Sequence, residues 1–275
     1  LSQLSFRKDA PHYNVVIVII DGMRRDVLTP EITPNLCRLA PEFTRFSNHF
    51  SGGNSTRFGV FSIIYGLHGG MWHHFLNARQ SPVLVDSLRD MGYEFQILSS
   101  TELTFPEFRK NAFVAIPESI KDDYPQATFD LRDKALVDDF ELFLEKRDTN
   151  RPFLAYMSIN ATHAMYVYPP DFEKFKPVTE PDFNFAGGLT PEKTGQLRNR
   201  YLNAMLFLDS LTGKLVDNLK SRGLMNNTIV IITGDHGEEF MENGVFSHNS
   251  GFDDYVLNVG GYANIPGVRT GEVTN

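Results

Sequence analysis

Four apolar runs recur along the chain, and each ends in small polar or acidic residues. They are NVVIVIIDG (14–22), YEFQILSS (93–100), RPFLAYMSIN (151–160) and NTIVIITGDHGE (227–238). A short apolar run without alternation is typical of a strand that is buried on both faces, as in a parallel sheet. The pattern therefore predicts a buried sheet whose strands carry polar residues at their carboxyl ends.

Helical periodicity separates these runs. Apolar residues spaced three or four apart occur in PVLVDSLRDMG (82–92), LRDKALVDDFELFLEKRD (131–148) and TGQLRNRYLNAMLFLDSLTGKLVDNLKSRG (194–223). Strands that alternate with helices predict an α/β fold, with a mostly parallel central sheet and helices on both faces. Ligands of such sheets bind at the carboxyl ends of the strands, where we expect Asp21, Asn160, Asp235 and His236.

Two segments lack this periodicity. Residues 1–13 are polar and irregular, which indicates a linker. Residues 165–193 are rich in proline and are typical of a long surface loop that could act as a lid.

Composition narrows the classes of function. The 275 residues carry a formal charge of −8 and no basic tract, which argues against nucleic-acid binding. The single cysteine, Cys37, cannot form an intrachain disulfide. No run of 18 apolar residues is present, so no segment of this chain is expected to span a bilayer.

The expected strand ends carry groups that suit a divalent cation. Adjacent Asp235 and His236, followed by Gly237, present an oxygen and a nitrogen ligand from one short loop. Asp21 adds a second carboxylate, although a carboxylate in this position also commonly caps the following helix. These residues alone leave both interpretations open.

The stretch SGGNSTRFG (51–59) contains a candidate nucleophile. Glycines flank Asn54, Ser55 and Thr56, and the following RFGVFSIIYG is typical of a helix. A cation beside Thr56 would lower the pKa of its hydroxyl group and make it an attacking group. A helix N-terminus would also favour an anionic ester nearby. Turn chemistry alone would explain the same composition.

Five motifs occur in a fixed order, namely NVVIVIIDG, GNSTRFGVFS, THAMYVYPP, VIITGDHGEEF and FSHNS. In this order they resemble the alkaline phosphatase/sulfatase superfamily, and most closely its membrane-anchored bacterial branch. Phosphoethanolamine transferases and lipoteichoic acid synthases are related to that branch. The resemblance covers residues 14–259. It implies a sulfatase-like domain over residues 14–275, a linker at 1–13 from a membrane anchor absent from this chain, and a location at the periplasmic face of the bacterial inner membrane.

The resemblance also implies a metal site. It implies one divalent ion, with Mn, Zn and Mg all suited to the ligands and a second ion left open. The implied ligands are Asp21, Thr56, Asp235 and His236. Thr56 would also be the nucleophile.

Other residues are implied around the substrate. His163 and His248 match histidines that lie at the substrate or at a second metal in the transferases, and either could protonate a leaving oxygen. Arg57 and Asn54 are candidate substrate-binding residues. Arg57 could equally be an exposed side chain without a partner.

The nucleophile motif argues against a sulphate ester as the substrate. True sulfatases form a formylglycine within C/S-x-P-x-R, whereas this chain reads S-T-R-F-G from Ser55 and C-R-L-A-P from Cys37. We therefore expect a phosphoester hydrolase or phosphoryl-group transferase that forms a phosphothreonine and acts on an envelope lipid or glycolipid.

A function from a different class remains as the alternative. The domain could be a non-catalytic, lipid-binding sensor or regulator of lipopolysaccharide or cardiolipin homeostasis, a role implicated for one group of this branch. Some members of that group lack the metal ligands. This chain retains all four, which favours the enzyme.

One segment departs from the family pattern. An apolar strand is expected after residue 259, followed by Pro-Gly, but LNVGGYANIPG has a glycine pair in its place. We therefore expect the domain to be altered or truncated after residue 259.

Overall fold

The computed structural model describes residues 11–274 except 182, 184–187 and 250, so most of the predicted linker lies outside the described residues. The described part of the chain forms an eight-stranded and a two-stranded sheet. The small sheet pairs β7 (Glu239–Phe240) with β8 (Phe246–Ser247). The strands of the large sheet follow in the spatial order β10 (Gly271–Val273), β2 (Thr44–Phe46), β9 (Gly261–Asn264), β6 (Thr228–Gly234), β1 (Asn14–Ile20), β5 (Phe153–Ile159), β3 (Glu94–Ser99) and β4 (Ile120–Lys121).

The centre of the large sheet is parallel. β1 lies between β5 and β6 and pairs in parallel with both, and β3 and β4 continue the parallel order beyond β5. β9 is antiparallel to β6 and to β2. The four apolar runs of the sequence are the four adjacent parallel strands β6, β1, β5 and β3, so the predicted mostly parallel sheet is confirmed.

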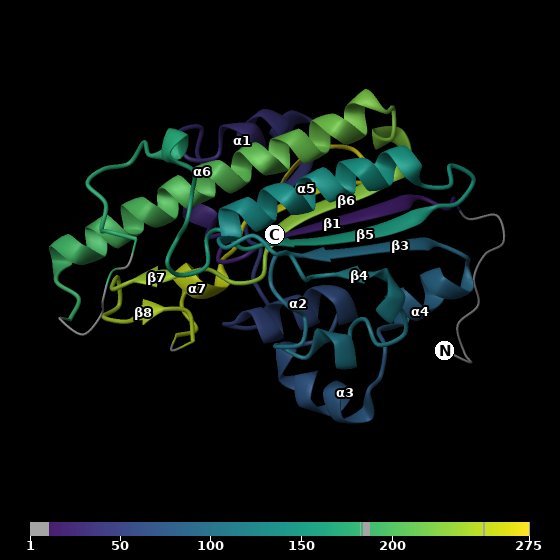
Figure 1. Cartoon of the computed structure of the whole chain (residues 1–275), viewed down its shortest axis with the longest axis horizontal. Coiled ribbons are helices and arrows are strands. Elements are labelled where there is room, and N and C mark those ends of the chain that lie inside the picture. Colours follow the sequence, from purple (N-terminus) through teal and green to yellow (C-terminus); the bar gives the residue numbers. More distant parts are fainter. Residues whose placement is uncertain (1–10, 182, 184–187, 250, 275) are drawn as a thin grey trace.

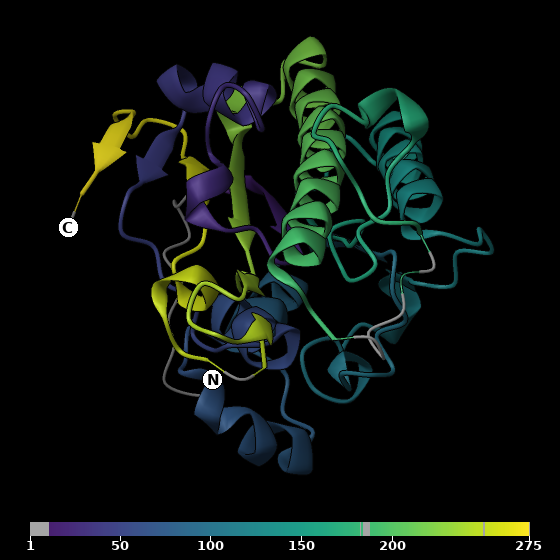
Figure 2. The same ribbon diagram turned by 90° about the vertical axis from the view of Figure 1, so that its left-hand side faces the viewer.

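Helices cover both faces of this sheet (Figure 1). One face carries α1 (Pro34–Leu39), α5 (Phe129–Lys146) and α6 (Pro191–Ser221), and the other carries α2 (Thr56–Tyr65), α3 (Trp72–Ala78) and α4 (Val83–Asp90). The short α7 (Asp254–Leu257) lies beside β7 and β8. Figure 2 shows β2 and β10 together at one edge of the large sheet. In the described part of the chain, no helix combines the length and the apolar character needed to cross a bilayer.

Strand β1 divides the core into two clusters. Val16, Val18 and Ile20 belong to the cluster under α5 and α6, whereas Ile17 and Ile19 belong to the cluster under α2 and α4. Successive side chains of a strand point to opposite faces, so a strand that is covered on both faces must be apolar throughout. This packing explains the unbroken apolar runs.

Helix α6 begins earlier than its apolar spacing indicates. Pro191 stands in its first turn, and the N-cap residue Thr190 accepts a hydrogen bond from Lys193 N. Proline suits a first turn because its missing N–H group would have no partner there. The predicted loop 165–193 is therefore shorter than expected. Part of it, residues 182 and 184–187, lies outside the described residues.

The glycine pair at 260–261 does not prevent strand formation in the stretch where we expected the domain to be altered or truncated. The pair leads into β9, which joins β6 to β2. A Cβ at Gly260 would lie 2.7 Å from Met23 Cε, and one at Gly261 would lie 3.0 Å from the ring of His49. Glycine stands here because neighbouring side chains pass close to the backbone.

Asp133 of α5 fixes the chain where β5 ends. Its Oδ1 accepts a hydrogen bond from Asn160 N at 2.9 Å, and its Oδ2 accepts one from Ala161 N at 2.7 Å. The side chain is fully buried. Burial raises the pKa of Asp133 to about 7, against the effect of these donors.

This shift predicts a pH dependence of stability. The unfolded carboxyl group titrates near pH 4, so between about pH 4 and 7 the folded protein binds more protons and loses stability as pH rises. Asp133→Asn cannot ionise, and its amide oxygen can replace Oδ2. We expect the melting temperature of the wild type, relative to this variant, to fall as pH is raised through that window. Parallel melting curves across the range would contradict the expectation.

Candidate metal centre

Two neighbouring strands deliver the acidic side chains. Asp21 follows β1 and Asp235 follows β6, and the two strands pair in register up to Ile20 and Gly234. The Gly22 N–H group donates to Asp235 Oδ1 at 3.2 Å, which ties the two strand ends together. Asp21 and Asp235 are each 1% exposed, so the sheet holds two carboxylates side by side, away from water.

Thr56 reaches these carboxylates from the first turn of α2. Its Oγ1 lies 3.4 Å from Asp21 Oδ2 and 3.2 Å from His236 Nε2. The helix approaches closely because residue 59 is glycine, where a Cβ would stand 1.9 Å from the carbonyl oxygen of Asp235. The Ser51 hydroxyl also donates to that oxygen. The segment 51–59 is therefore packed directly on the Asp235 loop.

The donor atoms fit a small divalent cation. Asp21, Asp235 and His236 each offer a ligand atom within 4.8 Å of the others. His236 Nε2 lies 3.5 Å from Asp235 Oδ2. Ligand atoms around a tetrahedral zinc ion, with bonds of about 2 Å, stand roughly 3.3 Å apart. Asp21 Oδ1 is buried without a hydrogen-bond partner among the described residues. A buried oxygen of this kind is costly unless a cation or a donor satisfies it.

His236 presents the correct nitrogen. Its Nδ1 lies 2.8 Å from Gly237 O, and since a carbonyl oxygen only accepts, Nδ1 carries the proton. Nε2, the other ring nitrogen, faces Thr56 and the carboxylates. Burial, reinforced by the charge of Asp21, raises the pKa of Asp235. A cation among these groups would offset that cost.

Both predicted histidines border the same space. His163 and His248 line a cavity of about 350 Å³ together with Asp21 and Thr56. The ring of His248 stacks on His236 at 4.0 Å, and its Nδ1 lies 3.2 Å from Glu238 Oε2. Burial alone lowers the pKa of His248, but the hydrogen bond and charge of Glu238 outweigh it and the net shift is upward.

The two predicted substrate-binding residues differ in placement. Arg57 lines the cavity, with its guanidinium group 3.5 Å from Glu107 Oε2 and 5.1 Å from the Phe105 ring centre. It is thus neither fully exposed nor without a partner. Asn54 is 7% exposed and donates to Gly251 O, so its side chain is held by the loop after β8.

Sequence reasoning missed the residues that hold the site in place. Glu238 positions His248, and the Thr162 hydroxyl donates to Asp21 O. The run DHGEE could have indicated a structural role for Glu238. Four polar residues that follow a buried strand need hydrogen-bond partners inside the protein. No comparable signal marked Thr162, which acts through a contact 141 positions away in the chain.

The close packing at Gly59 leads to a prediction. Gly59→Ala would drive a methyl group into the backbone of Asp235, so α2 must move away from the Asp235 loop. We expect a loss of about 1–3 kcal/mol in the free energy of unfolding and weaker cation binding. Thermal melting and metal titration would measure both effects.

Gly195→Ala is the matched control for that prediction. Gly195 is also helical, but a Cβ there meets no described atom within 4 Å. Wild-type stability and wild-type cation binding in Gly59→Ala would contradict the packing argument.

The fold and the clustered strand-end side chains define a member of the alkaline phosphatase/sulfatase superfamily. The sequence model of the Sulfatase family matches residues 13–257, and the chain belongs to that family.

Among its relatives, the inner membrane protein YejM of Salmonella typhimurium is 24% identical over 237 residues, which is 86% of this chain and 35% of YejM. The chain spans about a third of the length of the curated relatives that it matches.

Solved structures agree on the fold. The phosphonate monoester hydrolase of Agrobacterium radiobacter superposes with a TM-score of 0.73 at 18% identity, over 96% of this chain and 70% of that chain. The C-terminal periplasmic domain of EcEptC from Escherichia coli, in complex with Zn, gives a TM-score of 0.70 at 18% identity, over 94% and 74%. A metal ion is therefore bound by at least one protein of this fold.

Proposed function

We propose that this domain is a metal-dependent phosphoester hydrolase or phosphoryl-group transferase with Thr56 as its nucleophile. The observation that carries the proposal is the position of Thr56 Oγ1, at 3.4 Å from Asp21 Oδ2 and 3.2 Å from His236 Nε2. A threonine with no role beyond the surface would not be expected to direct its hydroxyl group towards a buried carboxylate and imidazole. Membership of the Sulfatase family supports the same class of reaction.

Asp21, Asp235 and His236 would hold the cation, with Thr56 completing the set. The cation, when bound, supplies a positive charge that lowers the pKa of an adjacent hydroxyl group and stabilises charge on phosphoryl oxygens. Metal analysis of the purified chain would identify the bound ion as Mn, Zn or Mg and would show whether a second ion is bound. A zinc ion in the related EcEptC structure favours zinc for the first trial.

The chain's own residues account for the remaining steps. Thr56 Oγ1 gives its proton to water in the cavity and forms a bond to phosphorus, while the bond from phosphorus to the leaving oxygen breaks. His163 or His248 gives a proton to that leaving oxygen, since both border the cavity. Water or an acceptor hydroxyl then attacks phosphorus and gives its proton to that histidine, while the bond from phosphorus to Thr56 Oγ1 breaks and Oγ1 regains a proton from water. Arg57 neutralises phosphoryl oxygens from the same wall.

The N-terminus of α2 favours an anion at this place. Thr56 begins the helix, Ser55 is its N-cap residue without a side-chain cap, and both residues line the cavity. The first N–H groups of the helix therefore lack a side-chain acceptor at this place. A phosphate ester would meet both these N–H groups and the cation.

The physiological setting is also a proposal. We infer that the substrate is an envelope lipid or glycolipid, and that residues 1–13 lead to a membrane anchor at the periplasmic side of the bacterial inner membrane. The likeness to an inner membrane protein supports this setting. Nucleic acid is not an expected partner at a formal charge of −8.

One experiment separates the enzyme from a non-catalytic sensor. The purified chain is incubated with 4-nitrophenyl phosphate, bis(4-nitrophenyl) phosphate and 4-nitrophenyl sulphate, each with Zn²⁺, Mn²⁺ or Mg²⁺. We expect 4-nitrophenol to be released from a phosphate ester in a metal-dependent reaction, and faster than it is released from 4-nitrophenyl sulphate. Lipid binding without turnover under any cation would support the sensor, and faster sulphate cleavage would overturn the choice of substrate.

A further inference from the structure

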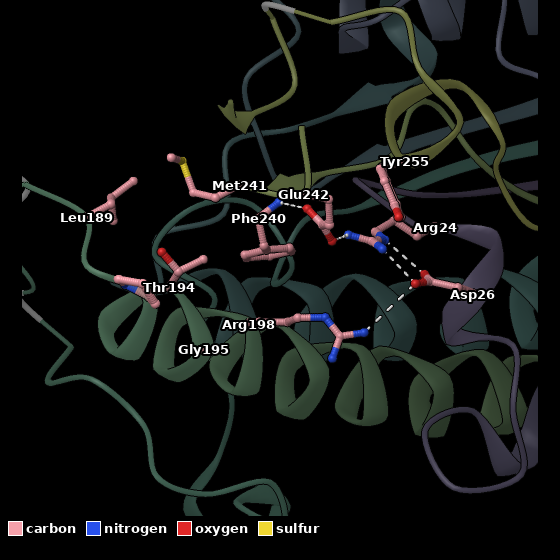
Figure 3. A pocket seen from close by; sticks show the side chains of 11 residues that line it. Arg24, Asp26, Leu189, Thr194, Gly195, Arg198, Phe240, Met241, Glu242 and Tyr255 are labelled. Atoms are coloured by element: carbon pink, nitrogen blue, oxygen red, sulfur yellow. Dashed lines mark hydrogen bonds and ion pairs between the residues drawn. The ribbon is translucent and has the colours of Figure 1, made fainter. Parts of the chain in front are cut away.

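A second cavity, of about 590 Å³, lies apart from the candidate metal centre and shares none of its lining residues. One face of the first two turns of α6 forms one wall, through Pro191, Thr194, Gly195 and Arg198. β7 and the loop after it, with Arg24, Asp26 and Tyr255, form the opposite side (Figure 3). The volume falls within the range of small-molecule sites, about 300–1,000 Å³.

Gly195 is the first indication that this cavity binds a ligand. Glycine within a helix costs about 1 kcal/mol relative to alanine, so it needs a reason. Gly213, also in α6, has one, because a Cβ there would lie 2.6 Å from Asn35 Oδ1. At Gly195 no described atom lies within 4 Å of the Cβ position, and the backbone conformation is helical. The missing side chain leaves room for a ligand against the helix.

The second sign is a hydroxyl group without a partner. Thr194 is 8% exposed, and its Oγ1 makes no hydrogen bond with any described residue. Figure 3 shows this hydroxyl turned away from α6, towards the side where Leu189 and Met241 lie. A buried hydroxyl costs free energy unless something accepts from it or donates to it.

Among the charged side chains that line the cavity, the carboxylates are fully hydrogen-bonded, and only N–H donors remain available to a ligand. Arg24 binds Asp26 through Nε at 2.8 Å and Nη2 at 2.6 Å, and it binds Glu242 Oε1 through Nη1 at 2.6 Å. Phe240 N donates to the other oxygen of Glu242. Every carboxylate oxygen on this wall therefore has a donor.

Arg198 remains largely unpaired. In the described part of the chain its one charged contact is Nη2 to Asp26 Oδ2 at 3.8 Å, and 43% of its side chain is exposed. Arg198 stands four residues after Thr194, so the two side chains lie on the same face of α6. Figure 3 shows the Arg198 guanidinium group turned towards Asp26 and the Thr194 hydroxyl turned towards Leu189 and Met241, so the two donors follow one another along the wall. The charged donor suits an acceptor with negative charge.

The rest of the lining is apolar. Leu189, Pro191, Phe240 and Met241 border the cavity, and Met241 is 38% exposed. We propose that this cavity binds a single-chain amphiphile with an anionic head group. The head group accepts hydrogen bonds from Arg198, the apolar chain lies over Gly195 between Leu189 and Met241, and the Thr194 hydroxyl donates to the ester oxygen that joins head group and chain. This inference does not depend on the proposed function.

Dodecyl phosphate below its critical micelle concentration is the probe. Isothermal titration calorimetry of the whole chain, with chelator present so that no cation recruits the phosphate, should give saturable binding of one molecule per chain. Inorganic phosphate, which lacks the apolar chain, and dodecyl maltoside, which lacks the charge, should each bind at least about tenfold more weakly. Equal binding of either compound, or binding that does not saturate, would overturn the proposal.

Two variants locate the binding. Gly195→Leu fills the space over the helix and should weaken binding of dodecyl phosphate at least about tenfold, while the melting temperature stays equal or rises because leucine favours a helix. Arg198→Gln should reduce the affinity to that of dodecyl maltoside. Lys220→Gln removes a charge from the far end of α6 and should leave binding unchanged. Wild-type affinity in Gly195→Leu would place the ligand elsewhere and refute the assignment.

Discussion

Thr56→Ala is expected to abolish phosphoester turnover, with a loss of about 10³-fold or more in kcat/KM. In the proposed mechanism this hydroxyl forms the covalent bond, because it lies 3.4 Å from Asp21 Oδ2 and 3.2 Å from His236 Nε2, and alanine leaves the surrounding packing in place. Thr56→Ser keeps an oxygen at the same position and should retain activity within about tenfold, since the lost methyl group takes no part in the reaction. Steady-state kinetics on the phosphate ester found best in the substrate trial would measure both variants.

Thr104→Ala is the control for that series. Thr104 is exposed and contacts Glu102, away from the cation ligands, so its variant should show wild-type kinetics. A trapped phosphoryl group on Thr56, detected by mass spectrometry after rapid quenching, should be present in the wild type and absent in Thr56→Ala. Full activity in Thr56→Ala would exclude Thr56 as the nucleophile, whatever its effect on metal binding.

Cation removal is expected to have the second large effect, on stability. A ligand that binds only the folded state at about 1,000 times its Kd adds roughly 4 kcal/mol. For a chain of this size that corresponds to a change of about 5–10 °C in the melting temperature. We expect a chelator to lower the melting temperature by this amount, and readdition of Zn²⁺ or Mn²⁺ to restore it.

Asp235→Asn tests whether the candidate site causes that change. The amide oxygen can still accept from Gly22 N and His236 N, and the amide nitrogen, in place of Oδ2, would face His236 Nε2. The variant removes one of two adjacent buried charges, so without metal it should melt higher than the wild type. With metal it should show little further increase.

Asp209→Asn is the matched buried control. Asp209 accepts hydrogen bonds from Asn35 N and Leu36 N, far from the cation ligands. Its variant should lose stability equally with and without metal, and it should keep the full metal response. If Asp235→Asn responded to metal as the wild type does, the cation would bind at another site.

The sequence by itself determined the central strands and the order of the motifs. The run at 14–20 is apolar on both faces because β1 is covered by helices on both sides of the sheet. In β6 the alternate residues Val230 and Ile232 are fully buried, whereas Ile229 and Ile231 are only partly buried. The proximity of Asp21, Asp235 and His236 was also predictable, because neighbouring parallel strands end at the same edge of the sheet. Thr56 was predictable only as a candidate, through its glycines and the family resemblance.

The tertiary structure decided what depends on distant contacts. The glycine pair at 260–261 leads into a strand because Met23 and His49 occupy the space of its missing side chains, and no local pattern reveals that. Asn54 is held by Gly251 O, and Arg57 is paired with Glu107, for equally non-local reasons. The cavity over Gly195 was also invisible in the sequence, because a helical glycine looks the same whether a side chain or open space lies above it. Local periodicity reports which faces are buried, whereas close approach between segments is fixed only when the whole chain has packed.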